Sequence, residues 1–236
     1  MITALNKAGF DINNSNHIFV SLGDLLDRGL QPQQCLDFVN NLPDERKILI
    51  RGNHEDLMHQ MIHGGNWPRS IDKHNGTWQT ARDLTGVDVA EVMYYMRGNK
   101  DWRKYYDSTK YYAIIGDNIF VHAWVPFLEG YIDKKYISKA IPIEEWNEID
   151  EYDWEHRYTW QNGMQRWKEG VIIPGKTIYC GHWNCSWARR NIEYKTNNEF
   201  DLNPENHKPF KAEGIVAMDA CTALTHIVNC EVIEIE

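Results

Sequence analysis

Short runs of apolar, β-branched residues recur along the chain, and each ends in a polar cluster. IFVSL (18–22) and KILI (47–50) are followed at once by glycine and charged residues, which is typical of buried strands that end in loops. NIFVHAW (118–124) and KTIYCGHW (176–183) have the same form. Between the first two runs, QPQQCLDFVNNL (31–42) carries its apolar residues at helical spacing. The pattern therefore predicts a strand, helix, strand unit with parallel strands.

The rest of the chain predicts a second sheet and two long excursions. GIVAMDACTALTHIVNCEVIEIE (214–236) alternates after a glycine, which suits a pair of strands in a second, partly antiparallel sheet. Residues 57–110 and 125–170 mix Gly, Pro, Trp and charge, so we expect helical or loop excursions that form a cap over the cleft. Within the second, EEWNEIDEYDWE (144–155) reads as a solvated surface. The length of 236 residues fits one elaborated domain, 1–236.

Composition narrows the class of protein. The net charge of −9 argues against an extended basic surface that would bind nucleic acid or an anionic membrane. No run of about 18 apolar residues occurs, and MITALNKAGF lacks the basic start and apolar centre of a signal peptide. The five cysteines are scattered and odd in number, which favours reduced thiols over a disulfide framework. We therefore expect a cytoplasmic protein without a nucleic-acid or membrane partner.

The ends of the predicted strands carry the candidate chemistry. The side chains concerned are Asp24, Asn53, His54, His122 and His182. In open α/β sheets such strand ends converge on one crevice. Carboxylate, amide and imidazole donors together suit manganese, iron or zinc. Arg28 and Arg51 lie on the same loops, where a guanidinium can hold phosphate oxygens, so the pattern indicates phosphoryl chemistry.

These residues fall in an ordered set of motifs that resembles a known family. GDLLDRG (23–29), RGNHE (51–55), VHA (121–123) and GHW (181–183) resemble the calcineurin-like metallophosphoesterases. The D-R-G ending and the arginine before G-N-H-E are similar to the branch of serine/threonine phosphatases and diadenosine tetraphosphatases, above all the phage lambda-type phosphatases. The resemblance covers nearly the whole chain, including HNGTW (74–78) and MDACTAL (218–224). It implies a layered α/β/β/α sandwich, with two mixed sheets flanked by helices.

The resemblance also implies a role for each residue. Asp24 would bridge two divalent metal ions, manganese by preference, and Asn53, His122 and His182 would complete the second metal site. His54 would be the general acid, with Asp27 orienting its imidazole, and Arg28 and Arg51 would grip the phosphate. A metal-bound hydroxide would then attack phosphorus in line, which needs no covalent intermediate.

The sequence departs from the family at its start. The family begins with an Asp-x-His-Gly motif at the end of its first strand, and nothing of that kind precedes ITALNKAGF. The pattern predicts that the chain opens in the middle of an amphipathic helix, because Met1 is not preceded by a cap residue. We therefore expect a truncated or mis-started chain that lacks the N-terminal strand, and a site that as written holds one metal ion rather than two.

Structural roles are the alternative for the same residues. Asp24 and Asp27 could cap a helix, and His122 taken alone could be a core histidine. Arg157 stands near the place of a further phosphate-binding arginine, but a surface role fits it equally. Cys185 is not expected to act as a nucleophile, because metal-assisted attack requires none.

The tryptophans allow one further inference. Three tryptophans lie beside the proposed ligand loops: Trp124, Trp183 and Trp187. They could form the walls of the cleft, where a nucleobase or a phosphotyrosine ring could stack on their flat rings. Four others are expected to anchor the excursions: Trp67, Trp78, Trp102 and Trp160. Packing is the alternative for all of them.

Three functions remain open. The first is a phosphomonoesterase that acts on phosphorylated protein or a small phosphoester. The second is a dinucleoside polyphosphate (diadenosine tetraphosphate) hydrolase, which uses the same centre under a different cap. The third is a non-catalytic remnant, because the first motif is missing. A nuclease ranks lower, since the acidic balance provides no groove for a nucleic-acid backbone.

Overall fold

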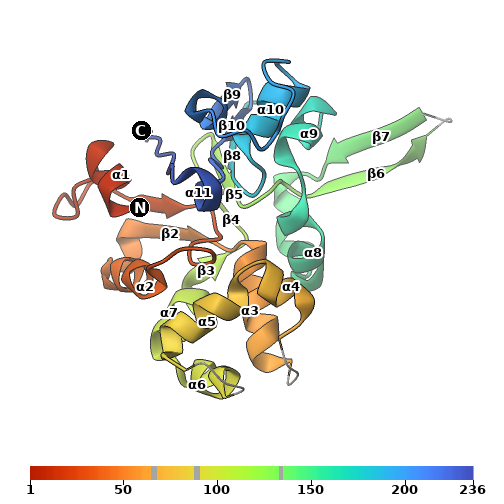
Figure 1. Ribbon diagram of the computed structural model, residues 1–236. Coiled ribbons are helices and arrows are strands. Elements are labelled where there is room, and N and C mark those ends of the chain that lie inside the picture. Colours follow the sequence, from red (N-terminus) through yellow and green to blue (C-terminus); the bar gives the residue numbers. More distant parts are fainter. Residues whose placement is uncertain (65–67, 88–90, 133–134, 236) are drawn as a thin grey trace. The chain divides into compact units, whose positions relative to one another are not determined.

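The computed structural model describes residues 1–64, 68–87, 91–132 and 135–235 (Figure 1). The chain divides into two compact units by its internal contacts. The N-terminal unit consists of Met1 with residues 9–110, and the C-terminal unit consists of residues 2–8 with the chain from Tyr111 onward. The arrangement of the whole chain as one domain stays a prediction.

The N-terminal unit contains a parallel three-stranded sheet in the order β1-β2-β3. Its strands are β1 (Phe19–Ser21), β2 (Lys47–Ile50) and β3 (Thr109–Lys110). Val20 pairs with Ile48 and Leu49 pairs with Thr109, both in parallel register. The helix α2 (Pro32–Asn41) connects β1 to β2 and buries Leu36 and Val39. The predicted strand, helix, strand unit is therefore confirmed.

The first excursion is helical, as expected. It is made of α3 (Asn53–His63), α4 (Ser70–His74), α5 (Thr77–Thr85), α6 (Val92–Gly98) and α7 (Lys100–Ser108). These helices are amphipathic, and the side chains of Met58, Ile62, Met96 and Tyr105 are fully buried. Burial of such apolar side chains stabilises each helix by about 1.5–3 kcal/mol per residue, so packing fixes the loops from which α3 and α5 begin.

The C-terminal unit contains a five-stranded sheet in the order β4-β5-β8-β10-β9. The strands are β4 (Tyr112–Ile115), β5 (Asn118–Val121), β8 (Thr177–Cys180), β9 (Phe210–Ala212) and β10 (Ile215–Ala217). β5, β8 and β10 run parallel, whereas β4 and β9 pair antiparallel at the two edges. The sheet is partly antiparallel, as predicted, and Ile119, Ile178 and Ile215 are fully buried in its centre.

Helices and a hairpin complete the C-terminal unit. The helices are α1 (Ile2–Lys7), α8 (Glu151–His156), α9 (Gly163–Lys168), α10 (Cys185–Asn191) and α11 (Thr222–Thr225), and the hairpin strands are β6 (Phe127–Ile132) and β7 (Lys135–Ala140). Helix α1 lies in the segment where the sequence predicts one. Short 3-10 helices cover Asp44–Arg46 in the N-terminal unit and Ile143–Glu148, Tyr158–Trp160 and Pro204–His207 in this one.

Two expectations for the C-terminal unit are wrong. The second excursion contains the antiparallel β6-β7 hairpin as well as helices and loops. At the C-terminus only β10 forms, and within residues 218–235 the sole regular element is α11. There the Asp219 carboxylate accepts the Cys221 N–H at 2.6 Å, and Cys221 adopts a left-handed φ of 53°. This turn interrupts the alternating pattern before a second strand can pair.

The structure confirms the mixed α/β class, with helices and several sheets. The acidic run exposes Glu144, Glu145 and Glu148, as expected of a solvated surface, but it also buries Trp146 and Trp154 in the core. Among the described residues, no helix has both the length and the apolar character needed to cross a bilayer.

Candidate active site

The loop that follows β1 has an unusual backbone at two of the predicted site residues. Asp24 has a φ of 53° and Arg28 a φ of 64°, both in the left-handed region. This region is uncommon for residues other than glycine, and holding one there costs about 1–3 kcal/mol. Strain of this kind gathers where a side chain must be aimed, so the loop is a candidate site on geometry alone.

A single buried carboxylate, that of Glu55 in α3, holds this loop. Glu55 is 2% exposed, and it accepts the backbone N–H groups of Asp24 at 2.9 Å, Leu25 at 3.1 Å and Gly52 at 2.8 Å. The hydroxyl of Tyr105 donates to Glu55 Oε1 at 2.8 Å. Burial, reinforced by the Glu55 carboxylate, raises the pKa of Tyr105 well above its ordinary value, so the hydroxyl remains a donor.

Gly52 allows the two loops of the N-terminal unit to meet. A Cβ added at Gly52 would lie 2.2 Å from Asp24 Oδ1 and 2.8 Å from the Asp24 backbone nitrogen. The Asp24 carboxylate instead accepts the His54 backbone N–H at 3.0 Å, in the first turn of α3. A carboxylate at a helix N-terminus is stabilised by the helix dipole. Asp24, Asn53 and His54 are therefore brought together, as the sequence predicts.

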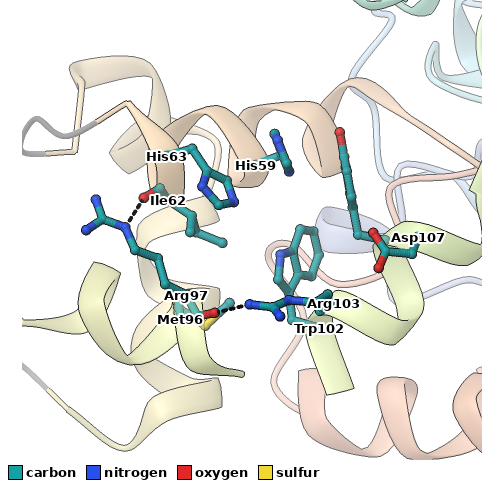
Figure 2. A pocket seen from close by; sticks show the side chains of 9 residues that line it. His59, Ile62, His63, Met96, Arg97, Trp102, Arg103 and Asp107 are labelled. Atoms are coloured by element: carbon teal, nitrogen blue, oxygen red, sulfur yellow. Dashed lines mark hydrogen bonds between the residues drawn. The ribbon is translucent and has the colours of Figure 1, made fainter. Parts of the chain in front are cut away.

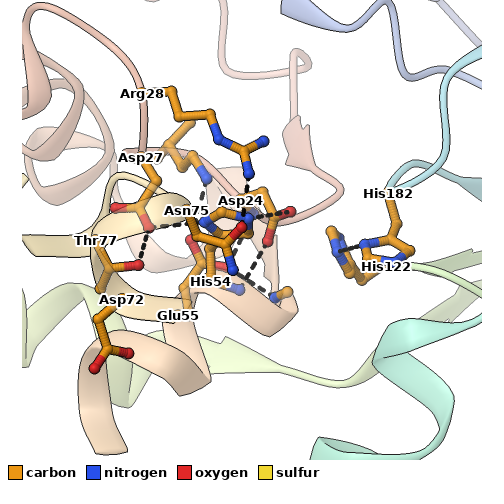
Figure 3. Close-up of polar contacts among 12 residues, drawn as sticks. Asp24, Asp27, Arg28, His54, Glu55, Asp72, Asn75, Thr77, His122 and His182 are labelled. Atoms are coloured by element: carbon orange, nitrogen blue, oxygen red, sulfur yellow. Dashed lines mark hydrogen bonds and ion pairs between the residues drawn. The ribbon is translucent and has the colours of Figure 1, made fainter. Parts of the chain in front are cut away.

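His54 is oriented from one side of its ring. Nδ1 of His54 lies 2.7 Å from Asp27 Oδ2, which also accepts the Thr77 hydroxyl at 2.6 Å (Figure 3). Nε2 lies 3.9 Å from Asp24 Oδ2. Burial disfavours the charged imidazolium, but the charges of Asp24 and Asp27 outweigh it and raise the pKa of His54 above its ordinary value. With Nδ1 engaged by Asp27, Nε2 is the ring nitrogen that faces Asp24.

The motif HNGTW supplies the partners of the loop. Asn75 Oδ1 accepts from Arg28 Nη2 at 2.8 Å (Figure 3). Gly76 has a φ of 86°, and a Cβ there would lie 3.0 Å from Arg28 Cγ. Because Thr77 holds Asp27 as well, the start of α5 positions both Asp27 and Arg28.

Arg51 lies in a different environment from Arg28. It is 9% exposed, Nε donates to Thr109 Oγ1 at 2.8 Å, and its guanidinium carbon lies 4.2 Å from the centroid of the Tyr106 ring. His59 stacks on the Tyr106 ring with a centroid distance of 4.4 Å and helps to line a small hollow of about 120 Å³ between α3, α6 and α7 (Figure 2). The predicted phosphate contact of Arg51 stays a prediction.

In the C-terminal unit, His122 and His182 follow the neighbouring parallel strands β5 and β8. His122 Nε2 lies 3.2 Å from His182 Nδ1 (Figure 3). His122 is 2% exposed, and His182 has a φ of 62°. Two imidazole nitrogens this close suit a shared cation, and the carboxylate and amide of Asp24 and Asn53 are donors for the same class of metal. Each of the two groups of donors, taken by itself, therefore fits a divalent transition metal.

The structure assigns packing roles to several other candidates. Trp124 is 1% exposed and belongs to the core, where its N–H donates to the Val171 carbonyl at 3.1 Å. The expectation that it walls a cleft is wrong, because its indole is enclosed. Arg157 packs its guanidinium 5.3 Å from the centroid of the Tyr158 ring. Cys185 is fully buried, and burial raises the pKa of its thiol to about 12, which makes it a poor nucleophile.

The other tryptophans divide between core and surface. Trp102 is buried at 4% exposure, as expected of an anchor, whereas Trp160 and Trp183 are 38% and 36% exposed. Trp78 and Trp187 are half-buried. Trp67 lies outside the described residues.

Glu55, Asn75, Thr77 and Tyr105 were not assigned roles by the sequence. For Glu55 a signal existed, because an acidic residue at the third position of a helix closes a capping box. Asn75 and Thr77 lie in HNGTW, a motif that does not by itself reveal which side chains they hold.

Comparison with known proteins identifies the family. The sequence model of the calcineurin-like phosphoesterases matches residues 2–213. The chain belongs to this family. No curated protein matches the chain.

Solved structures resemble this chain only distantly. A metallophosphoesterase from Sphaerobacter thermophilus is 16% identical, with a TM-score of 0.38, 77% of this chain covered and 54% of that one. A cold-active protein-tyrosine phosphatase from a psychrophilic Shewanella species is 15% identical, with a TM-score of 0.43, 87% of this chain covered and 61% of that one. The chain thus spans less than two thirds of either structure.

Proposed function

We propose that this calcineurin-like phosphoesterase is a metal-dependent phosphomonoesterase of the serine/threonine type. The observation that carries the proposal is the clamp on His54, whose Nδ1 is held by Asp27 at 2.7 Å while Nε2 faces the Asp24 carboxylate at 3.9 Å. A neutral packing histidine does not need two carboxylates beside its ring, whereas a general acid needs one nitrogen fixed and the other presented.

The metal sites are part of the same proposal. Asp24 and Asn53 from the N-terminal unit, and His122 and His182 from the C-terminal unit, would hold the divalent ions that the family uses, manganese by preference. When bound, such ions polarise phosphoryl oxygens and lower the pKa of water. The family motifs support the proposal that these two groups of ligands bind the same pair of ions.

The residues of the chain have separate tasks in the reaction. Arg28, which is fixed by Asn75, binds the non-bridging oxygens of the phosphate. His54 protonates the leaving oxygen as its bond to phosphorus breaks, and Asp27 keeps the imidazole in the required orientation and stabilises its charged form. Arg51 adds a second positive charge on the loop after β2.

The substrate is proposed to be phosphoserine or phosphothreonine in a protein, or a small phosphoester, in the cytoplasm. A dinucleoside polyphosphate is the second candidate, because the exposed rings of Trp160 and Trp183 could receive a base. The test compares manganese-dependent hydrolysis of a phosphoserine peptide with that of diadenosine tetraphosphate. Faster turnover of the peptide supports the first candidate, faster turnover of the dinucleotide supports the second, and hydrolysis of neither contradicts the proposed function.

A further inference from the structure

Two tryptophan rings flank His182 in the C-terminal unit. The ring of Trp160, at the end of the 3-10 helix Tyr158–Trp160, lies 6.0 Å from the imidazole centroid at an interplanar angle of 79°. The ring of Trp183, the next residue along the chain, lies 5.9 Å away at 63°. Both rings therefore meet the imidazole edge to face, so the predicted metal ligand is bordered by two indoles.

Each indole is held in place through its only polar atom. Trp160 Nε1 donates to the Glu155 carbonyl at 3.1 Å, and Trp183 Nε1 donates to Glu199 Oε1 at 3.0 Å. Glu199 is itself fixed by Arg190, whose Nη1 lies 3.9 Å from Glu199 Oε2. With the N–H groups engaged, the surface that each ring offers to solvent is mainly ring carbon.

The exposure of these rings distinguishes them from the core tryptophans. Trp160 is 38% exposed and Trp183 is 36% exposed, whereas Trp124 and Trp146 are each 1% exposed. A single exposed tryptophan is common on protein surfaces, but two such rings beside the same predicted metal ligand form a local apolar surface that a flat ligand could cover. A ring that is already anchored loses little conformational entropy when a ligand stacks on it, so the pair is preorganised to bind.

We infer that Trp160 and Trp183 form a ring-binding subsite that, among the small phosphoesters admitted by the proposed function, favours those whose alcohol half carries a flat aromatic group. Stacking of an aromatic ring or base on an indole strengthens binding and tolerates different ring types, because every such ring has a π-face. The shared chemistry is a flat aromatic ring in the esterified alcohol, either an aryl group bonded to the ester oxygen or a nucleobase linked to it through a sugar. The inference rests on the proposed function in one respect, because the phosphate would be bound beside His182.

Binding is tested without catalysis. In metal-free, ¹⁵N-labelled protein, the indole N–H signals of the two residues are assigned with Trp160→Phe and Trp183→Phe, and the chain is titrated with three probes. Phenyl phosphate and adenosine 5′-monophosphate carry a ring, and glycerol 3-phosphate does not. We expect both signals to shift with a ring-bearing probe and to stay in place with glycerol 3-phosphate.

The two ring-bearing probes distinguish the source of the ring. Shifts with phenyl phosphate alone assign the subsite to aryl esters, and shifts with the adenosine nucleotide alone assign it to nucleobases. Shifts with neither, or equal shifts with glycerol 3-phosphate, overturn the inference.

Activity provides an independent test. The double substitution Trp160→Ala with Trp183→Ala should lower kcat/KM at least tenfold for the preferred ring-bearing ester and change it less than twofold for glycerol 3-phosphate. Comparing each ester with itself removes the effect of leaving-group acidity. Tyr152→Ala is the matched control, because this ring is 67% exposed and stacks on His156 instead, and it should leave the ratio unchanged.

The outcomes separate this inference from the proposed function. Equal losses for all esters in the double variant would overturn the subsite while hydrolysis by the unaltered chain stands. If the unaltered chain hydrolyses no ester in the presence of manganese, the proposed function fails, and the indole titration still decides whether rings bind.

Discussion

The Glu55 carboxylate holds the backbone of Asp24, whose N–H donates to Glu55 Oε2 at 2.9 Å. Asp24 sits in a left-handed conformation, and the same carboxylate also accepts from Gly52 and from the Tyr105 hydroxyl. A proposed metal ligand is thus positioned by a residue that need not touch the metal. Residues that orient a ligand in this way commonly change metal affinity by about 10–100-fold when replaced.

Glu55→Gln should therefore weaken both the fold and the proposed metal site. Glutamine keeps one acceptor but turns its NH₂ toward buried N–H donors, and an unsatisfied buried group costs about 1–3 kcal/mol. We expect manganese affinity, measured by calorimetry, to fall at least tenfold. Glu45→Gln, an exposed residue outside the loop, is the control, and equal behaviour of the two variants would contradict the positioning role.

Gly52→Ala should disrupt the approach of the two loops. Its Cβ would lie 2.2 Å from Asp24 Oδ1, so the carboxylate has to move, and overpacking of this kind costs about 1–3 kcal/mol. Urea denaturation and phosphatase assays should show a loss of both stability and turnover. Gly98→Ala, where no atom lies within 4 Å of the added Cβ, should be neutral or slightly stabilising because Gly98 is in a helix. Normal activity in Gly52→Ala would contradict the geometry.

Asn75→Ala should affect substrate binding more than the chemical step. Removing Asn75 Oδ1 releases Arg28 Nη2, so the guanidinium must be ordered again when phosphate binds. We expect KM for a small phosphoester to rise several-fold, with a smaller change in kcat. Asn191→Ala, which removes a bond to the Trp187 carbonyl on α10, is the comparison. A fall in kcat at constant KM would show that Asn75 does not act through Arg28.

The buried thiols predict how stability depends on pH. Burial raises the pKa of the Cys185 thiol to about 12, above its ordinary value of 9.0, so above pH 9 the unfolded chain loses a proton that the folded chain retains. The stabilisation is complete below pH 9 and is lost as pH rises from about 9 toward 12. The unfolding free energy should decline less steeply over this range in Cys185→Ala, and the variant should hydrolyse phosphoesters normally. Loss of hydrolysis in this variant would make Cys185 a candidate nucleophile after all.

The sequence predicts the elements that periodicity and strand ends define. Asp24, Asn53 and His54 meet because two parallel strands end side by side, and His122 and His182 meet for the same reason in the other sheet. The clustering of each group follows from the sheet topology, because the carboxyl ends of neighbouring parallel strands lie at the same edge.

The sequence fails where an outcome depends on contacts that are distant along the chain. The β6-β7 hairpin is hidden by mixed composition, and residues 218–235 alternate but gain no strand partner, because Cys221 and Asp219 form a turn. Trp124 stands next to a ligand loop in sequence but packs into the core. The burial of a side chain is decided by what covers it, and that is a property of the folded chain.

The most direct test of the account measures manganese binding and phosphoester turnover in His54→Ala beside Asp24→Ala. His54 is proposed to act as a general acid that does not bind the metal. His54→Ala should therefore lower kcat by about two to four orders of magnitude and leave the manganese affinity close to that of the unaltered chain. Asp24→Ala should lose both. Equal loss of manganese in the two variants, or full turnover in His54→Ala, would contradict the account.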